Sequence, residues 1–173
     1  MPVSISCSEE SSSDEAAIER VVTAAFGQPG EARLVTQLRA NGGLVFSAVA
    51  KLADEVVAHV AYSEVTIGGR ASQPAVLALA PVAVAPLQQR QGYGSQLVRW
   101  SLDELKRRDF PAVIVLGEPE FYRRFGFGPA SGFEIQCPFD VPGEYFMALE
   151  LQPGALADQS GIVGYRPEFA ALS

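Results

Sequence analysis

A glycine-bearing turn with amide and basic side chains is the first stretch of this chain whose residues could do chemistry. Residues 89–94 are Gln-Arg-Gln-Gly-Tyr-Gly, and they follow the apolar run Val76–Val84, which predicts a buried strand. Residues 95–108 have the apolar spacing of an amphipathic helix. The free N–H groups of such a turn and the positive end of a helix dipole together bind anions. Gly92 and Gly94 allow a ligand close to the backbone. We therefore expect a pyrophosphate group at this turn.

Two other phosphate-binding patterns are excluded at this turn. The dinucleotide fingerprint G-x-G-x-x-G fails because Leu97 stands where its third glycine belongs. The turn also lacks the Gly-Lys-Ser/Thr sequence that marks a nucleoside triphosphate loop.

Composition limits the class of protein. The chain has 173 residues, of which 48% are hydrophobic, so we expect a single domain over residues 1–173 with a buried core. A net charge of −7 argues against a nucleic-acid partner. The longest apolar run, residues 76–85, is too short for a membrane span and contains Pro81.

The N-terminal residues and the cysteines bear on localisation and metal binding. The first ten residues are acidic and lack a basic region followed by an apolar one, so we expect no signal peptide. Cys7 and Cys137 form no disulfide framework, which favours a cytoplasmic location. With one histidine and two distant cysteines, no metal-ligand spacing exists.

Apolar periodicity predicts a mixture of helices and strands. Helices are expected over residues 14–26, 31–40, 95–108 and 118–125. Strands are expected over residues 3–7, 44–51, 55–67, 76–84 and 112–116, with a hairpin turn at 53–54. The segments 133–136 and 145–151 are predicted to form a closing antiparallel pair.

Pro81 predicts an irregularity in its strand. Proline removes a ladder hydrogen bond and normally indicates an edge strand or a bulge. The run around it is too apolar for an exposed edge, so we expect a bulge or splay at residues 80–82. Splayed strands leave backbone groups that a ligand with amide bonds can pair with.

Two blocks of sequence resemble one enzyme family, the GCN5-related N-acetyltransferases (GNAT). Residues 89–94, preceded by Val-Ala-Pro at 84–86, resemble its acetyl-CoA loop of the form Q/R-x-x-G-x-G/A. Residues 115–127, Val-Leu-Gly-Glu-Pro-Glu-Phe-Tyr-Arg-Arg-Phe-Gly-Phe, resemble its strand-five and helix-four segment. This second block and residues 25–35 are similar to a bacterial subgroup of predicted N-acetyltransferases. The resemblance covers nearly the whole chain.

The resemblance implies an α+β (mixed α/β) fold, with a central splayed mixed sheet flanked by helices and acetyl-CoA bound between two parted strands. It implies an acyltransferase that moves an acetyl group from acetyl-CoA to a primary amine of a small molecule or peptide by direct attack. Tyr122 matches the position of the general acid that protonates the departing CoA thiolate. A backbone N–H near Val82 is the candidate donor to the oxyanion. The residues that match the family's cofactor contacts are Val82, Ala83, Val84, Gln89, Arg90, Gln91, Gly92, Tyr93, Gly94, Ser95, Phe121 and Tyr122.

The general base is less evident, because the strand Val76–Val84 carries no carboxylate. Glu31, Glu64, Glu118 and a water relay remain as candidates. We favour Glu31, which lies where the family's substrate loop belongs. His59, the one histidine, stands in an apolar strand and is expected to be a buried, hydrogen-bonded structural residue. Ser63 shares its strand face by period two.

A departure from the family and two alternatives bear on function. The asparagine that the family commonly has after strand five is replaced near residues 117–118, so this part of the cofactor contacts differs. A non-catalytic acyl-CoA sensor on the same fold is the main alternative, and an interaction module is another. The amine acceptor is unidentified, although the acidic charge suits a cationic amine. The chain is expected to be a monomer or a homodimer.

Overall fold

The computed structural model describes residues 4–172, which divide into two compact units. Of the described residues, unit 1 is formed by 4–63, 80–101 and 167–172, and unit 2 by Glu64–Leu79 and Leu102–Arg166. The third and fourth strands and the third helix continue from one unit into the other. Within the described residues, no helix is both long and apolar enough to cross a membrane.

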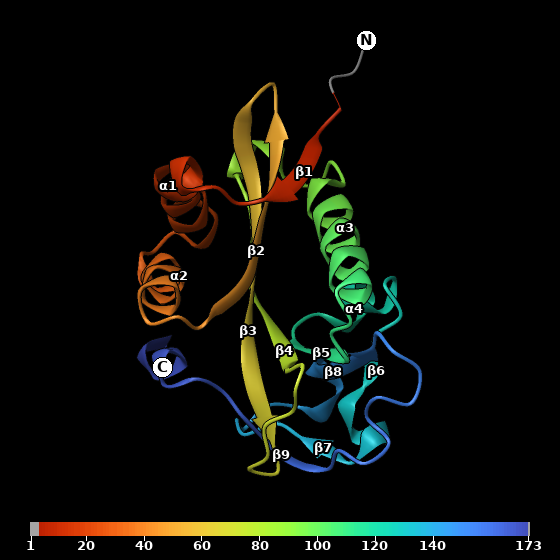
Figure 1. Cartoon of the computed structure of the whole chain (residues 1–173). Coiled ribbons are helices and arrows are strands. Elements are labelled where there is room, and N and C mark those ends of the chain that lie inside the picture. The colour runs from red at the N-terminus through yellow and green to blue at the C-terminus, as the bar shows by residue number, and fades with distance from the viewer. Residues whose placement is uncertain (1–3, 173) are drawn as a thin grey trace. The chain divides into compact units, whose positions relative to one another are not determined.

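Helices and strands are intermixed along the chain (Figure 1). The α-helices are α1 (Glu15–Phe26), α2 (Gly30–Ala40), α3 (Tyr93–Arg107) and α4 (Pro119–Arg123). The strands are β1 (Ser6–Glu9), β2 (Leu44–Leu52), β3 (Glu55–Ile67), β4 (Val76–Val84), β5 (Ala112–Leu116), β6 (Gly128–Pro129), β7 (Ile135–Gln136), β8 (Phe146–Glu150) and β9 (Gly161–Gly164). Short 3₁₀ turns include η2 (Pro86–Gln88) and η5 (Pro167–Leu172).

The strands form a mixed sheet in the order β1-β2-β3-β4-β5-β8-β6, and β9 pairs with β3 and β7. β4 pairs with β5 in parallel, whereas β5 pairs with β8 in antiparallel orientation. The parallel ladder joins Leu77 to Val113 and Ala78 to Ile114. Among the described residues this ladder has no pair beyond Ala78, although β4 continues to Val84. The two strands therefore part, and the predicted splayed mixed sheet with flanking helices is confirmed.

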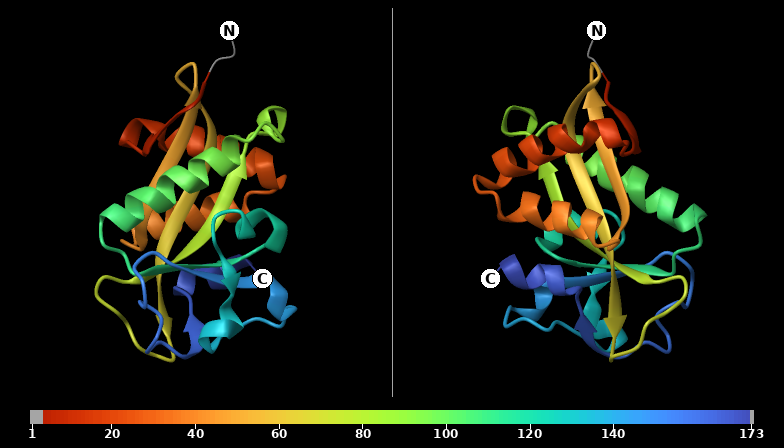
Figure 2. Two further views of the ribbon diagram at one scale, coloured as in Figure 1. Left: turned by 90° about the vertical axis from the view of Figure 1, so that its right-hand side faces the viewer. Right: turned by 60° about the vertical axis from the view of Figure 1, so that its left-hand side comes forward.

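In unit 1, the hairpin β2–β3 carries helices on both of its faces (Figure 2). Its turn places Ala53 and Asp54 at positive φ, as a two-residue hairpin turn requires. Helices α1 and α2 cover one face through an apolar cluster that includes Ile18, Val22 and Val35. The long apolar strands and the 3.6-residue spacing of the helices thus produce a layered core, as the sequence predicted.

The opposite face of this hairpin packs against α3. The rings of Phe46 and Trp100 lie 6.3 Å apart between centroids, and Phe46 also contacts Tyr62. The hydroxyl of Tyr62 is hydrogen-bonded to the hydroxyl of Ser101 at 2.6 Å, deep in the core. These contacts fix the axis of α3 and with it the position where the helix begins.

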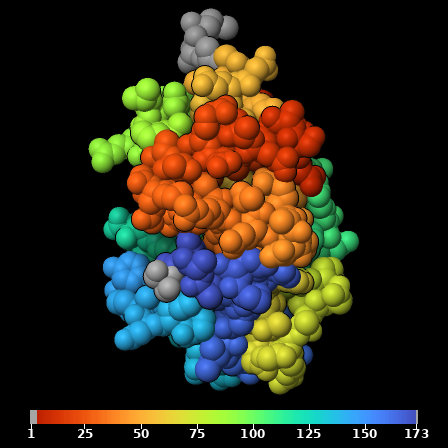
Figure 3. Space-filling model, turned by 90° about the vertical axis from the view of Figure 1, so that its left-hand side faces the viewer, coloured from red at the N-terminus to blue at the C-terminus, as the bar shows by residue number. Residues whose placement is uncertain are grey.

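The C-terminal turn η5 also belongs to unit 1 and packs against α2 (Figure 3). The amide of Asn41 donates to the carboxylate of Glu168 at 2.9 Å, just beyond the end of α2. A Cβ at Gly30, the first residue of α2, would lie 3.6 Å from Cδ2 of Leu172. Both ends of α2 are therefore in contact with the C-terminal segment.

In unit 2, β5 lies between β4 and β8 and is the centre of a second core. Its residues Ala112 and Ile114 pack with Val76, Phe146 and Val163. The continuous apolar run of β5 predicted burial on both faces, and Ala112–Val115 are indeed all at most 1% exposed, while Leu116 at the strand end is 38% exposed.

The predicted pairing of segments 133–136 and 145–151 is wrong. The strand β8 pairs with β5 and β6, while Ile135 and Gln136 of β7 pair in parallel with β9. Residue 133 belongs to a 3₁₀ turn instead. Two residues of extended chain carry too little periodicity to specify a partner, and β8 finds a longer ladder against the fully apolar β5.

Other element boundaries shift by a few residues. The strand predicted over residues 3–7 is observed at Ser6–Glu9, and Val3 lies outside the described residues. Helix α3 begins at Tyr93, two residues before the predicted start, and α4 is shorter than the predicted 118–125. Helix ends commonly differ by this much, because end residues gain few helical hydrogen bonds.

Candidate functional site

The last residues of β4, 82–84, belong to unit 1 and lead into the turn before α3. Ala83 is 3% exposed and packs with the α1–α2 cluster, while Val82 and Val84 on the other side are half-buried. The Ala85 N–H donates to the Val57 carbonyl at 2.8 Å, which holds the strand end against β3. The strand therefore has a fixed conformation up to the point where the chain enters the turn.

The turn between β4 and α3 is built on its own backbone and carries exposed side chains. The 3₁₀ turn η2 is closed by the Gln88 N–H, which donates to the Ala85 carbonyl at 2.8 Å. Leu87 at its tip is 88% exposed. Arg90 adopts a φ of 65° and Gly92 a φ of 83°, so the chain twice enters the left-handed region before the helix begins. Gly92 meets that demand without steric cost.

Helix α3 starts directly after this turn. The Gln96 N–H donates to the Gly92 carbonyl at 3.0 Å, which marks the first helical turn. A Cβ at Gly94 would lie 3.1 Å from Cγ2 of Val84, so the missing side chain lets the helix start lie close against β4. The first N–H groups of an α-helix have no partner within the helix, and the dipole adds positive potential at the same end.

The two glutamine side chains of the turn support its backbone. Nε2 of Gln89 donates to the Val84 carbonyl at 3.0 Å, and Nε2 of Gln91 donates to the Leu87 carbonyl at 3.3 Å. The resemblance implied both residues as cofactor contacts, and in the structure each side-chain amide is bonded to the backbone of the turn. Arg90 is exposed, and its side chain has no partner in the described part of the chain, so it is available to a ligand.

In unit 2, an aromatic cluster surrounds Tyr122 on the short helix α4. Its ring makes edge contacts with Phe121 at 4.9 Å and with Phe127 at 5.7 Å between centroids. The guanidinium of Arg124 lies 4.9 Å from the centroid of Phe121 and covers the outer side of the cluster. Pro119 at the start of the helix supplies a preset φ for this short element.

Burial leaves Tyr122 protonated. The residue is 9% exposed, and this burial raises the pKa of its hydroxyl to about 12. Its hydroxyl makes no hydrogen bond with any of residues 4–172. Tyr122 thus keeps its phenolic proton, and its hydroxyl is unbonded among the residues that the structure describes.

Gly117 determines where this ring lies, and the sequence did not identify it as a functional position. A Cβ at Gly117 would stand 2.5 Å from Cε2 of Tyr122, so only glycine admits the ring. The Gly117 N–H donates to the Tyr145 carbonyl at 2.9 Å, which fixes the glycine in turn. A glycine between a buried strand and a proline-initiated helix is the pattern that could have revealed it.

The three candidate bases lie at different places. Glu31 stands in the first turn of α2, half-buried, and receives the Gln28 amide at 3.2 Å. Glu64 forms an ion pair with Arg166 at 3.0 Å. Glu118 is exposed, and its carbonyl accepts the Tyr122 N–H at 3.2 Å at the start of α4. Of the three, Glu31 belongs to unit 1, together with the turn between β4 and α3.

His59 is a buried structural residue, as predicted. It is fully buried, and its Nε2 is hydrogen-bonded to the Ser47 hydroxyl at 2.8 Å. Burial, with the nearby positive charge of Arg39, lowers the pKa of His59 to about 3. Its Nδ1 and the Ser63 hydroxyl are both buried without a partner among the described residues.

Comparison with known proteins identifies the family. A model of the acetyltransferase (GNAT) domain matches residues 8–130. The chain is 33% identical over 157 residues to the uncharacterized N-acetyltransferase YhbS of Escherichia coli K12, covering 90% of this chain and 93% of that protein. It is therefore a member of the GNAT acetyltransferase family.

Two solved structures resemble the chain over nearly its whole length. The GNAT family N-acetyltransferase YhbS from Escherichia coli, crystallised with CoA, has a TM-score of 0.92 and 31% identity, covering 98% of this chain and 94% of that one. A GNAT family acetyltransferase from Brucella melitensis, crystallised with acetyl-CoA, has a TM-score of 0.80 and 31% identity, covering 97% and 99%.

Proposed function

We propose that this GNAT family member transfers an acetyl group from acetyl-CoA to a primary amine of a small molecule or peptide, with Tyr122 as the general acid. The observation that supports this most directly is the state of Tyr122. Its hydroxyl is protonated, has no hydrogen-bond partner among residues 4–172, and belongs to a ring fixed by packing against Gly117.

The turn between β4 and α3 fits the charge and shape of the CoA pyrophosphate. Gly92 supplies a left-handed conformation and Gly94 lets the start of α3 lie close to β4. Backbone N–H groups at a helix N-terminus are suited to a doubly charged phosphate bridge. The proposed contacts run along the loop from Gln89 to Ser95, with Val82, Ala83 and Val84 toward the pantetheine arm and Phe121 beside Tyr122. Relatives crystallised with CoA or acetyl-CoA support this assignment.

The chemistry needs one proton to leave the amine and one to reach sulfur. Acetyl-CoA supplies the activated thioester. As the amine nitrogen bonds to the acetyl carbon, the C–S bond breaks and the electron pair leaves with sulfur. The Tyr122 hydroxyl gives its proton to that sulfur and is reprotonated from solvent. Burial disfavours any anion. The pKa of a CoA thiol beside the ring is therefore raised as well, toward that of the Tyr122 hydroxyl that donates the proton.

One backbone role and one side-chain role complete the proposal. A Val82 N–H donates to the acetyl oxygen as negative charge develops on it, because a fixed donor needs no reorganisation during the reaction. Glu31 accepts the proton from the attacking amine. Its carboxylate accepts from the Gln28 amide at both oxygens, at 3.2 Å and 3.4 Å, and keeps lone pairs for a second donor.

The test is the Tyr122→Phe variant, assayed by release of free CoA thiol with a panel of amines and peptides. Removal of a general acid should lower kcat by about 100-fold or more while acetyl-CoA binding is retained. Tyr145→Phe, a half-buried tyrosine of the same unit, is the matched control and should keep its activity. Unchanged turnover in Tyr122→Phe would refute the acid role.

The same panel separates an enzyme from a non-catalytic acyl-CoA sensor. Acetyl-CoA binding without turnover on any amine would favour the sensor, whereas failure to bind acetyl-CoA would contradict both. We retain as predictions the single domain over residues 1–173, the cytoplasmic location, the monomeric or homodimeric state, and the absence of nucleic-acid and membrane partners.

A further inference from the structure

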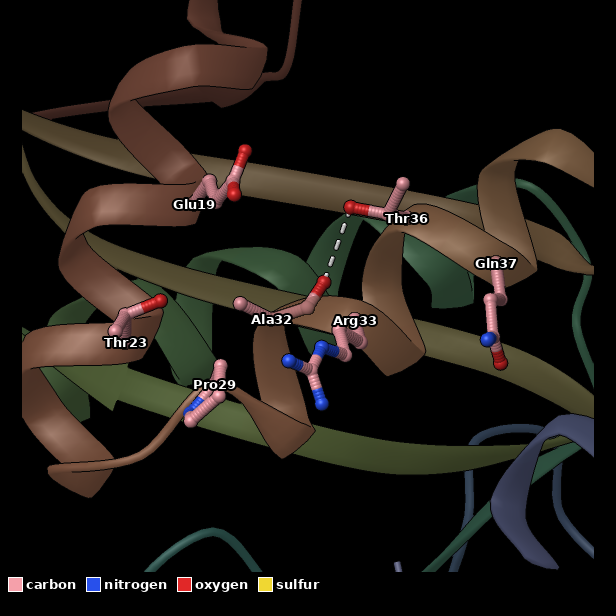
Figure 4. A pocket seen from close by; sticks show the side chains of 7 residues that line it. All are labelled: Glu19, Thr23, Pro29, Ala32, Arg33, Thr36 and Gln37. Carbon is pink, nitrogen blue, oxygen red and sulfur yellow. Dashed lines mark hydrogen bonds between the residues drawn. The ribbon is translucent and has the colours of Figure 1, made fainter. Parts of the chain in front are cut away.

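We infer that the groove between α1 and α2 binds a small zwitterion that carries an ammonium and a carboxylate group, such as a free α-amino acid. The groove encloses about 360 Å³ within unit 1 (Figure 4). It lies between the two helices, and its lining residues are Glu19, Thr23, Pro29, Ala32, Arg33, Thr36 and Gln37. No residue assigned above to acetyl transfer belongs to this set.

Helical spacing brings these side chains to one groove. Glu19 and Thr23 are four residues apart on α1, as are Arg33 and Gln37 on α2, so each pair shares a helix face. Figure 4 shows Glu19 and Thr23 on one helix and Arg33 and Gln37 on the other, with Ala32 between Thr23 and Arg33. Ala32 is 4% exposed, and its small side chain leaves the space that a larger residue would fill.

The groove carries one charge of each sign, and neither is neutralised within the described chain. Glu19 and Arg33 form no ion pair or hydrogen bond through their side chains among residues 4–172. Elsewhere on these two helices, Glu15 and Arg39 are paired. Arg39 holds Glu10 at 2.9 Å and Glu15 at 3.0 Å. A ligand with a positive and a negative group would therefore supply an ion-pair partner for both Glu19 and Arg33.

Thr36 adds a preference for a donor. Its hydroxyl donates its single hydrogen to the Ala32 carbonyl at 3.1 Å, so the oxygen can act toward a ligand only as an acceptor. An ammonium group can donate to Thr36 and to the Glu19 carboxylate together. Arg33 offers a planar fork of donors that matches a carboxylate. The set thus selects an ammonium and a carboxylate on one small molecule.

The affinity should be low, because the groove is open and few contacts form. We expect a Kd in the millimolar range, roughly 1–10 mM. Nuclear magnetic resonance titration of the full chain without acetyl-CoA suits such an affinity, and it does not depend on acetyl transfer. The probe is L-alanine. Propionate and ethylamine each retain one of its two charged groups, and the dipeptide Ala-Ala carries the same charges farther apart.

L-Alanine should produce saturable shifts in the amide signals of α1 and α2, and propionate and ethylamine should bind at least about tenfold more weakly. Tighter binding of Ala-Ala than of L-alanine would assign the groove to peptide-sized zwitterions. Glu19→Gln and Arg33→Gln should each weaken L-alanine binding by about tenfold. Arg20→Gln, on α1 but outside the groove lining, should leave it unchanged.

The inference is overturned if L-alanine and Ala-Ala both fail to shift these signals at about 50 mM, well above the expected Kd. It is equally overturned if Glu19→Gln and Arg33→Gln bind L-alanine as tightly as the unaltered chain. The double variant Glu19→Arg with Arg33→Glu shows whether a single substitution weakens binding through loss of charge or through misfolding. It restores both charges and should recover part of the L-alanine binding.

Discussion

The turn between β4 and α3 and the segment of residues 117–127 position functional groups by different means. In the turn the backbone conformation positions the N–H groups, and the side chains of Leu87 and Arg90 face solvent. In the segment a buried ring, Tyr122, is fixed by the packing of Gly117 and Phe127. A backbone site depends on φ and ψ and is insensitive to most exposed side chains. A packed site depends on volume, so a single added methyl group is enough to displace it.

The largest effect should come from Gly117→Ala. Its Cβ would stand 2.5 Å from Cε2 of Tyr122, so the ring must move. We expect turnover to fall by about 100-fold, because misplaced acids lose most of their catalytic contribution. Stability should fall by about 1–3 kcal/mol from overpacking. CoA release and thermal melting measure the two effects.

Gly128→Ala is the control for that substitution. A Cβ there would meet no atom within 4 Å, and the residue does not have a positive φ. Turnover in Gly117→Ala that equals that of Gly128→Ala would mean that the position of the Tyr122 ring does not govern catalysis.

A smaller effect is expected from Gly92→Ala in the turn. The space around the new Cβ is open, but a φ of 83° strains any residue with a side chain, at a cost of about 1 kcal/mol. We expect the KM for acetyl-CoA to rise by about tenfold with kcat nearly unchanged. If kcat falls and KM stays constant, the turn does not act through cofactor binding.

The raised pKa of Tyr122 gives a prediction for stability against pH. In the folded chain the pKa is about 12, against 10 for the unfolded residue. Above pH 10 the unfolded state therefore loses its proton first. The contribution of Tyr122 to stability is complete below pH 10 and is lost as the pH rises toward 12, by about 1 kcal/mol per pH unit.

Urea unfolding at pH 9, 10 and 11, values chosen to bracket the ordinary tyrosine pKa of about 10, measures this loss. The pKa of Tyr165 is raised as well, so the unaltered chain must be compared with Tyr122→Phe. The variant should show a shallower decline. Equal slopes would indicate that Tyr122 ionises as readily in the folded chain as in the unfolded one.

The smallest effect should come from Arg90→Gln. The side chain is exposed, so its attraction for a phosphate is screened by solvent. We expect the KM for acetyl-CoA to rise by only about threefold and to depend less on salt than in the unaltered chain. If Arg90→Gln raises the KM for acetyl-CoA more than Gly92→Ala does, the side chain and not the backbone of the turn dominates cofactor binding.

The sequence was most informative where periodicity is long. The patterns over residues 31–40 and 44–67 predicted α2 and the β2–β3 hairpin almost to the residue, because each of these elements is long, with 11, 9 and 13 residues. The burial of His59 also followed from its apolar strand. By contrast, β7 has two residues, and its parallel pairing with β9 joins Ile135 to Gly161, residues far apart in the sequence that share no common pattern.

The amino-acid sequence by itself was enough to recognise the two blocks that resemble the GNAT family, the glycines of the turn and Tyr122 as a candidate residue. These features depend on local residue types alone. Only the tertiary structure decided that Gly117 contacts the Tyr122 ring, that Gln89 and Gln91 support the turn, and that α1 and α2 share a polar groove. The physical reason is that such contacts join side chains whose proximity is set by packing between elements, which no local pattern encodes.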